Sequence, residues 1–333
     1  MSSGTNELLS VQGLDVDLPL AAGLRTVLHD VSFTIGAGEA LGLVGESGSG
    51  KSMTARAVAR LLPPGAAQSG AIQFDGRDVN TLKGPALRGF RGQVAMIFQD
   101  PRAHINPVRT IGDFMTEALR TNRRMKRSLA QSAAISMLDE VGISDGALRL
   151  RQHPHELSGG LLQRVMIATS LLTEPRLLLA DEPTTALDVT TQAEVMAILD
   201  ELRRDRNMAM LFITHDLELA SAVCDRTAVM YAGQIVEQRQ SSLLHDDPLH
   251  PYTAGLVAAR PSIDGSTARL NAIPGRPLSA FEAPAGCAFS DRCAYAESRC
   301  TEARPAIRPM FDGLVRCVRA EDLRGELGVT VHG

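Results

Sequence analysis

Residues 45–52 read GESGSGKS and stand between two segments of different periodicity. The apolar run EALGLVG (39–45) is typical of a buried strand, and KSMTARAVARLL (51–62) is typical of a helix. The eight residues fit G-x-x-x-x-G-K-[ST] in the strand–loop–helix context that this motif requires. The glycines let successive backbone N–H groups turn inward, and the helix adds its positive end, so the loop predicts a phosphate site.

Two side chains of this loop suit a nucleoside triphosphate bound with magnesium. Lys51 can reach the β- and γ-phosphates, and the Ser52 hydroxyl can ligand Mg²⁺. The plainer alternative is a flexible Gly/Ser loop, but the flanking strand and helix argue against it. The predicted nucleotide-binding residues of the loop are Gly45, Glu46, Ser47, Gly48, Ser49, Gly50, Lys51 and Ser52.

Short strand patterns alternate with helical patterns along most of the chain, which predicts an α/β fold with a largely parallel core sheet. Residues 110–157 are helical in pattern, with polar turns, and 226–238 predict a hairpin that turns at Ala232-Gly233. The other predicted elements are strands at 71–79, 93–100, 175–183 and 209–216 and a helix at 190–205.

Acidic and histidine side chains follow two of these strands. PRLLLADEP (175–183) ends in Asp181 and Glu182. The first can hold Mg²⁺ and the second can polarise an attacking water. AMLFITHD (209–216) places His215 at the end of its strand. A lone histidine there is more often structural, but together with the phosphate loop and the carboxylates it predicts a contact to the γ-phosphate.

The stretch LSGGLLQR (157–164) predicts the start of a helix with Ser158 as its N-cap. No acid occurs in the first turn, although ordinary helix starts attract Asp and Glu. The stretch is therefore either a plain capped helix or an anion site made by Ser158, Gly159 and Gly160.

Composition places this 333-residue chain among ordinary globular proteins. Its net charge of −4 gives no general attraction to nucleic acid, and the basic run at 120–127 is more often a solvated helix face. No apolar stretch is long enough to span a bilayer, and the N-terminus lacks a signal-peptide pattern, so a cytoplasmic protein is expected.

The five cysteines are unevenly distributed. Cys224 stands alone in a helical pattern and is predicted to lie in the core. The other four, which we call the tail cysteines, are Cys287, Cys293, Cys300 and Cys317. In a reducing compartment such a cluster favours metal over disulfides. Their separations of five, six and sixteen residues match neither a standard zinc pattern nor a ferredoxin pattern, so spacing alone does not name the metal.

The composition of the sequence changes after about residue 245, where Pro, Gly and Cys become frequent and the hydrophobic periodicity weakens. We therefore predict a main domain at 1–245, with a helical subdomain at about 100–157, and a small Cys-rich domain at 246–333.

The order and spacing of these motifs resemble those of ATP-binding cassette (ABC) ATPases over residues 7–245. The resemblance rests on the phosphate loop, Gln99, LSGG, ADE (180–182), TTALD (184–188) and His215. It implies a P-loop fold with a RecA-like core, an antiparallel β part and a helical subdomain, binding ATP and Mg²⁺. It also implies that Ser52, Gln99 and Asp181 ligand the magnesium and that the catalytic residues are Lys51, Gln99, Glu182 and His215.

In that family two cassettes face head to tail. The resemblance implies that Ser158, Gly159 and Gly160 cap the γ-phosphate of ATP on the partner's loop, and that Asp188 lies at the dimer seam. Leu161 and Leu162 depart from the family, which often has polar or basic residues there. No aromatic residue occurs between Leu8 and Ser32 to stack on adenine, and Arg25 is a candidate substitute.

A narrower resemblance covers almost the whole chain. QDPRAHINP (99–107), HPYT (250–253) and the Cys-rich tail look like the ATPase subunits of dipeptide, oligopeptide and nickel importers. This implies a second cassette as partner, which is either another copy of the chain or, as the family often has it, a homologous chain in a heterodimer. It also implies two transmembrane permeases and, through them, an extracytoplasmic binding protein. No nucleic acid partner is implied, and the expected location is the cytoplasmic face of the membrane, as a peripheral subunit.

The narrower resemblance also implies one [4Fe–4S] cluster on the tail cysteines, with zinc and unligated thiols as the alternatives. Two further functions stay open: a non-transport ABC ATPase that acts on ribosomes or DNA, and an iron–sulfur sensor with a vestigial cassette. The first usually has two cassettes or a long coiled-coil insert, and neither occurs here. The intact Lys51, Asp181, Glu182 and His215 argue against the second.

Overall fold

The computed structural model describes residues 7–21, 23–184, 187–259 and 273–327, and the chain divides into two compact units. The first is built mainly from Asp75–Phe212, and the second from Leu9–Thr34, Ala40–Phe74 and Ile213–Gly333. The phosphate loop and the Cys-rich tail thus belong to the second unit, and the helical region belongs to the first. No helix in the described ranges is long and apolar enough to cross a membrane.

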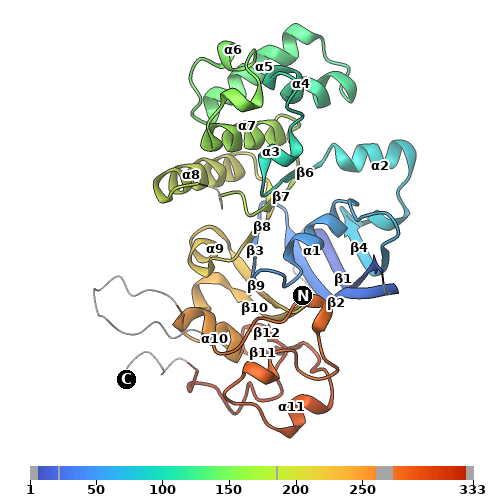
Figure 1. Ribbon diagram of the computed structural model, residues 1–333, viewed down its shortest axis with the longest axis vertical. Helices are drawn as coiled ribbons and strands as arrows, with labels where there is room; N and C mark the ends of the chain where they lie inside the picture. The colour runs from blue at the N-terminus through green and yellow to red at the C-terminus, as the bar shows by residue number, and fades with distance from the viewer. Residues whose placement is uncertain (1–6, 22, 185–186, 260–272, 328–333) are drawn as a thin grey trace, which may run out of the picture. The chain divides into compact units, whose positions relative to one another are not determined.

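A sheet at the centre of the second unit carries the phosphate loop (Figure 1). Its strands there follow in the order β11 (Arg308–Met310), β12 (Gly313–Val315), β10 (Gln234–Gln240), β9 (Arg226–Tyr231) and β3 (Ala40–Val44). The pair β3–β9 is parallel, whereas β9–β10, β10–β12 and β11–β12 are antiparallel. The tail thus extends the sheet instead of forming a separate module.

The hairpin between β9 and β10 turns where the sequence predicts it. Ala232 and Gly233 have φ of 43° and 80°, the left-handed values that a tight two-residue hairpin turn requires. The Gly233 N–H donates to the carbonyl of Ser49 at 2.8 Å. This turn therefore packs directly against the phosphate loop.

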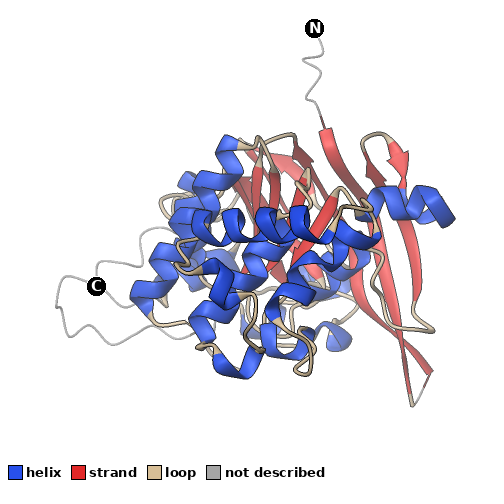
Figure 2. Cartoon of the chain, turned by 90° about the horizontal axis from the view of Figure 1, so that it is seen from above, coloured by secondary structure: helices blue, strands red, loops and turns tan. Residues whose placement is uncertain are grey.

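The second sheet of this unit contains the longest strands. β1 (Glu7–Leu20) lies between β2 (Gly23–Gly36) and β4 (Ala67–Phe74), and β1 pairs with β4 in antiparallel register. Figure 2 shows the long strands running side by side. Leu9, Val11, Leu14 and Val16 of β1 are buried, so this sheet presents an apolar face to the core.

The predicted strands at 93–100, 175–183 and 209–216 each end two or three residues early, and two other predicted elements end earlier still. The strand predicted at 71–79 stops at Phe74, because Asp75 and Gly76 take φ of 52° and 72° and turn the chain into β5 (Arg77–Asp78). The helix predicted at 51–62 is α1 (Lys51–Val58). Its pattern continues, but Arg60 has φ of 58°, which no helix residue adopts.

The first unit pairs β6 (Val94–Ile97) in parallel with β7 (Leu177–Asp181). Both lie within predicted strands, and every residue of β7 is buried. The parallel pairs in the two units confirm the prediction of parallel core strands. β8 (Ala209–Thr214), fully buried, begins in the first unit and ends in the second.

The helical region is α4 (Ile111–Thr121), α5 (Arg127–Glu140) and α6 (Gly146–Arg149), and α5 contacts α4, α6 and α7 (Gly159–Leu171). Figure 1 shows these helices grouped together. The remaining helices are α2 (Gly84–Arg91), α3 (Pro101–His104), α8 (Val189–Asp205), α9 (Leu217–Val223), α10 (Pro251–Ala258) and α11 (Ser298–Glu302). Short 3-10 turns are η1 (Val79–Thr81), η2 (Pro154–Glu156), η3 (Ser241–Leu243), η4 (Ala280–Glu282) and η5 (Ser290–Arg292).

Two interpretations of surface and core are confirmed. The basic run is exposed, and its arginines form ion pairs: Arg123 with Glu174 at 3.4 Å, and Arg120 and Arg127 with Asp113 at 3.6 Å each. These pairs are internal to the first unit, so the run is solvated as expected, but residues 122–126 form the connection between α4 and α5 and are not a helix face. The lone Cys224 is buried, with 7% of its surface exposed.

Candidate functional site

The phosphate loop has the backbone that its glycines make possible. Gly48 and Gly50 have φ of 80° and 107°, values that favour glycine. Gly45 is required for a different reason, since a Cβ at this position would lie 2.1 Å from the carbonyl oxygen of Met230. The loop therefore passes too close to β9 for any side chain at its first position.

Lys51 lies buried beneath this loop, with 4% of its surface exposed. Its Nζ donates to the carbonyl oxygens of Gly45 at 2.7 Å and Glu46 at 3.0 Å. Ser49 is 2% exposed, and its hydroxyl has no hydrogen-bond partner within the described ranges. α1 has no acid in its first turn. A buried cation, an unsatisfied hydroxyl and a helix start without acid together fit an anionic phosphate ligand.

In the first unit, the structure brings two predicted catalytic residues together. The Gln99 Nε2 donates to Glu182 Oε2 at 3.0 Å. Asp181, the last residue of β7, is 3% exposed, while Glu182 is half-buried. Glu182 has φ of 46°, which is uncommon outside glycine and concentrates at functional sites. The carboxylate is thus held by its backbone and by a side-chain partner.

His215 belongs to the second unit and follows the last residue of β8. Its side chain is exposed. The next residue, Asp216, is the N-cap of α9 and accepts hydrogen bonds from the N–H groups of Glu218 at 2.8 Å and Leu219 at 3.1 Å. The strand end and the helix cap together hold His215 on a short, fixed connection.

Ser158 is the N-cap of α7, as the sequence predicts, and its Oγ accepts from the Leu161 N–H at 3.3 Å. The first turn has no acid. A Cβ at Gly159 would have no atom within 4 Å, so the helix start is open there. Leu162 is fully buried in the core, while Leu161 is half-buried.

Asp188 is the N-cap of α8. Its carboxylate accepts hydrogen bonds from the Thr191 backbone N–H at 3.0 Å and from the Thr191 hydroxyl at 2.8 Å. The backbone hydrogen bond and then the hydroxyl hold the pKa of this exposed carboxyl below its usual value. A Cβ at Gly160 would lie 3.3 Å from Thr191, so the starts of α7 and α8 are neighbours. Thr185 and Ala186 of the predicted TTALD stretch lie outside the described residues.

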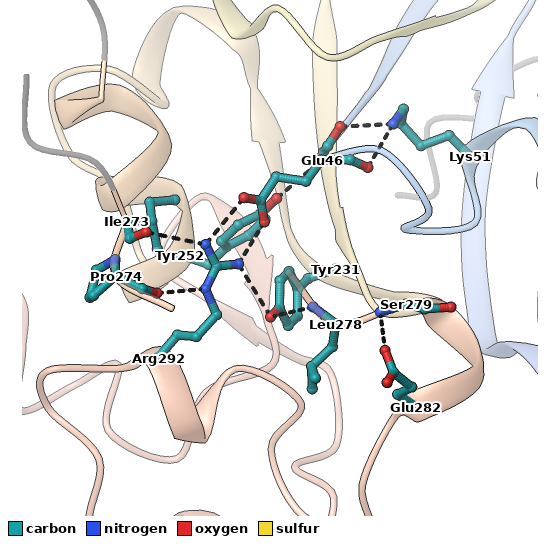
Figure 3. Close-up of polar contacts among 11 residues, drawn as sticks. Glu46, Lys51, Tyr231, Tyr252, Ile273, Pro274, Leu278, Ser279, Glu282 and Arg292 are labelled. Carbon is teal, nitrogen blue, oxygen red and sulfur yellow. Dashed lines mark hydrogen bonds and ion pairs between the residues drawn. The ribbon is translucent and has the colours of Figure 1, made fainter. Parts of the chain in front are cut away.

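Three residues that the sequence did not single out surround Glu46 (Figure 3). Arg292, in η5, donates to the Glu46 carboxylate at 2.7 and 3.2 Å. The hydroxyl of Tyr252 accepts from the Glu46 N–H at 3.0 Å, and the hydroxyl of Tyr231 accepts from Arg292 at 3.3 Å. The one available signal was the acid itself, since a carboxylate in an anion-binding loop needs a counter-charge.

All four tail cysteines line one cavity, together with His250 and Arg319. Burial raises the pKa of Cys287, Cys293 and Cys317, the last to about 11, where the other three tail cysteines raise it further. A Cβ at Gly286 would lie 2.7 Å from the carbonyl of Thr301. That glycine therefore allows the backbone before Cys287 to approach α11.

His250 faces this cavity with a fixed tautomer. Its Nδ1 accepts from the Tyr252 N–H at 3.0 Å, and burial lowers its pKa to about 3, so the ring is neutral and Nε2 carries the proton. Glu237 accepts from the N–H groups of Leu249 and His250 at 2.9 Å each and fixes the loop before α10. The Nε2–H, although buried, has no partner in the part of the chain described.

The metal predictions are not confirmed by the side-chain positions. Among the described residues, no three His, Cys, Asp or Glu side chains come together as a site for a metal ion. This holds for the tail cysteines. The predicted magnesium ligands Ser52, Gln99 and Asp181 include a hydroxyl and an amide, which are not among these side-chain types, and they stay a prediction. The cysteines share a cavity, but they do not converge on a single point.

Arg25, the candidate for stacking on adenine, also contacts the tail. Its guanidinium donates to the carbonyl of Phe281 in η4 at 2.6 Å. His29, on the same strand, lies 3.3 Å from the carbonyl of Ala280. The sequence pointed to neither contact, because the partners are more than 250 residues apart.

A strand–loop–helix with a buried lysine, and a strand end with paired carboxylates, define a P-loop ATPase. The chain matches the family models "ABC transporter" at residues 28–185 and "Oligopeptide/dipeptide transporter, C-terminal region" at 236–300. It is 43% identical to the oligopeptide transport ATP-binding protein OppD of Haemophilus influenzae, over 89% of this chain and 92% of that one. It is equally 43% identical to the dipeptide transport ATP-binding protein DppD of Bacillus subtilis, over 86% and 87%.

Solved structures of ABC cassettes are similar to this chain as well. A bacterial ABC transporter cassette, solved as a dimer, superposes with a TM-score of 0.63 at 25% identity, over 70% of this chain and 98% of that one. A post-hydrolysis dimer of an ATP-binding cassette with ADP and phosphate gives the same values. The chain belongs to the ABC transporter family of ATP-binding proteins and is an ATPase with the ABC fold. The predicted fold class and enzyme class are thereby confirmed.

Proposed function

We propose that this chain is the ATP-hydrolysing subunit of a membrane importer for peptides. The observation that carries the proposal is the buried Lys51 and glycine nest of the phosphate loop, in a chain whose relatives are named for oligopeptide and dipeptide transport. A nickel or other small-solute importer of the same family is the alternative cargo class. The boundaries proposed are 1–245 for the cassette, including the helical part at about 100–157, and 246–333 for the tail.

The roles proposed for the residues follow from their chemistry. The backbone N–H groups of residues 45–52 and Lys51 bind the β- and γ-phosphates. Ser52, Asp181 and Gln99 would hold Mg²⁺, which neutralises phosphate charge when it is bound. Glu182 accepts a proton from water, oriented by Gln99, and His215 contacts the γ-phosphate. The buried lysine and the unsatisfied Ser49 hydroxyl support a phosphate at this loop.

The signature helix is proposed to act on a second cassette. Ser158, Gly159 and Gly160 would present the positive end of α7 to ATP held by the partner, and Asp188 would lie at the seam between the two. The open surface at Gly159 and the acid-free first turn support this role. We propose a homologous chain as the partner, so that the cassette pair is a heterodimer.

The remaining partners are proposed from the names of the relatives. Two transmembrane permeases would take up the motion of the cassettes, and an extracytoplasmic binding protein would deliver cargo to them. The chain would sit as a peripheral subunit on the cytoplasmic face of the membrane. The acidic net charge and the internally paired basic run support a reading without nucleic acid.

For the tail we propose a [4Fe–4S] cluster held by Cys287, Cys293, Cys300 and Cys317. A zinc ion needs its sulfurs about 2.3 Å from one point, whereas in a cubane cluster each cysteine ligates a different iron and the sulfurs stand apart. All four cysteines line one cavity, which supports a single ligand shared by the four thiolates. The buried donor of His250 supports the cluster, because cluster sulfurs accept such hydrogen bonds.

Affinity purification from solubilised membranes tests the proposed function. Recovery of two membrane permeases and a second cassette is expected, followed by peptide-stimulated ATP hydrolysis after reconstitution in vesicles. Recovery of ribosomes without permeases would contradict the importer and favour a non-transport ATPase. Stimulation by nickel but not by peptides would replace the cargo class and keep the importer.

A further inference from the structure

The tail reaches the phosphate loop through a charged pair that is largely shielded from water. The Arg292 side chain is 5% exposed, and its partner Glu46 is 24% exposed. The guanidinium also donates to the carbonyl of Pro274 at 2.8 Å and lies 5.8 Å from the ring centroids of Tyr231 and Phe289. Figure 3 shows the arginine pointing from the tail to the glutamate of the loop. We call this pair the clamp.

The position of Glu46 gives the clamp a chemical meaning. The residue follows Gly45 in the loop, and its own carbonyl accepts from Lys51. An unpaired carboxylate here would repel the triphosphate that the loop is built to bind, and partial burial would strengthen this repulsion. Arg292 cancels that charge, while the hydroxyl of Tyr252 fixes the Glu46 backbone.

The clamp is continuous with the rest of the tail. The Arg292 N–H donates to the carbonyl of Phe289 at 3.0 Å, and the following residue is Cys293. A second link joins the Ala280 N–H to the carbonyl of Gly48, also in the loop, at 3.1 Å. The tail therefore touches the loop at two positions, Glu46 and Gly48.

We propose that Arg292 is a positioning residue for ATP binding, which acts through Glu46 by cancelling its charge. The tail is then a working part of the nucleotide site, and the affinity of the chain for ATP depends on the tail's fold. Arg292 contacts the loop through the Glu46 carboxylate, so its effect on the loop is transmitted by Glu46.

The test is a set of variants of the full chain that differ in charge at the clamp. We expect Arg292→Ala, which leaves a net negative charge beside the loop, to weaken equilibrium binding of a fluorescent ATP analogue about tenfold. Glu46→Gln leaves a net positive charge and is expected to bind about threefold more tightly. The double variant restores neutrality and is expected to return the affinity to near that of the natural chain.

A matched control is available in the same tail. Arg276 makes a similar two-bonded pair with Glu282 at 2.9 and 2.6 Å, but it is exposed and does not contact the loop. Arg276→Ala should leave ATP affinity unchanged. Circular dichroism and thermal melting of each variant establish that it is folded before affinity is compared.

The order of affinities decides the outcome. If the double variant binds ATP no more tightly than Arg292→Ala, the proposal is overturned. In a merely structural role each substitution would weaken ATP binding, and the double variant would bind as weakly as the worse single variant or more weakly still. Weaker binding by Glu46→Gln alone would overturn the proposal equally, and this variant decides the question even if Arg292→Ala does not fold. In Arg292→Ala and Glu46→Gln the ATPase assay should show the change in KM, with kcat moving much less.

Discussion

At the scale of single residues, Glu182 combines local strain with a specific partner. A left-handed backbone at a non-glycine position costs about 1 kcal/mol or more and persists only where the surroundings enforce it. Here β7 ends one residue earlier, and Gln99 bonds the carboxylate. These constraints hold the carboxylate beside Gln99 in a fixed position, as a general base requires.

The first prediction is that Glu182→Gln keeps ATP binding and loses turnover. The amide cannot accept a proton from water, and removing a general base costs roughly 10²–10⁴-fold in rate. Phosphate release should be measured in the full complex, alongside nucleotide binding to the same preparation. Near-normal hydrolysis by this variant would remove Glu182 from the mechanism.

The second prediction concerns the close approach at Gly45. In Gly45→Ala the new methyl group would meet the backbone oxygen of Met230 at 2.1 Å, so the loop or β9 must shift. Overpacking of this kind costs about 1–3 kcal/mol, and we expect a lower melting temperature and loss of ATP binding. The control is Gly89→Ala in α2, where a Cβ meets no atom within 4 Å. Equal behaviour of the two variants would contradict the steric argument.

Sequence reasoning succeeded where chemistry is local in the chain. The strand–loop–helix around Lys51, the cap at Ser158 and the turn at Ala232 each depend on neighbouring residues and were predicted correctly. The clamp could not be predicted, because Glu46 and Arg292 are 246 positions apart and nothing in either neighbourhood names the other. The early end of α1 was missed for a different reason. The apolar pattern of the helix continues past Arg60, so the pattern does not show that the chain turns there.

At the scale of elements, the start of α7 is an unusual helix terminus. Its first four N–H groups have one side-chain acceptor, Ser158, and no acid offsets the positive end of the dipole. The body of the helix is anchored by Leu162 and by Arg164, which bonds Glu194 of α8 at 2.6 Å. A firmly packed helix with an uncompensated start is suited to meet an anion from outside the chain.

The third prediction is that Gly159→Asp separates the stability of the chain from the activity of the complex. An acid at a helix start stabilises by about 0.3–1 kcal/mol, and the site has room for it. The melting temperature of the isolated chain should therefore stay the same or rise. ATP binding to its own loop should persist, while hydrolysis in the complex is lost, because the carboxylate would face the partner's γ-phosphate. Loss of nucleotide binding by the isolated variant would contradict action in trans.

At the scale of the whole molecule, the tail has only a small apolar cluster of its own and also packs on the core of the second unit. Phe289 packs against Tyr231 and Tyr252, with ring centroids at 5.4 and 5.3 Å. The buried Arg316 donates to the carbonyls of Ile235 and Pro305 at 3.1 and 3.0 Å, beside the pairing of β12 with β10. The composition of the tail revealed that it is poor in apolar residues, but not that the cassette supplies the missing surface.

The last prediction tests what the tail cysteines hold. Protein purified without oxygen should be brown and contain about four irons and four sulfides per chain, because each cysteine of a [4Fe–4S] cluster ligates one iron. Cys300→Ser should bleach the colour and lower the melting temperature, since the lost metal–ligand bonds contribute to folding. Cys224→Ser is the control, because Cys224 is buried and outside the cavity lining. One zinc per chain without acid-labile sulfide would contradict the cluster and indicate a zinc site. A colourless, metal-free natural chain whose melting temperature is the same as that of Cys300→Ser would mean that the cavity holds thiols alone. Packing against Tyr231 and Tyr252 would then suffice to fold the tail.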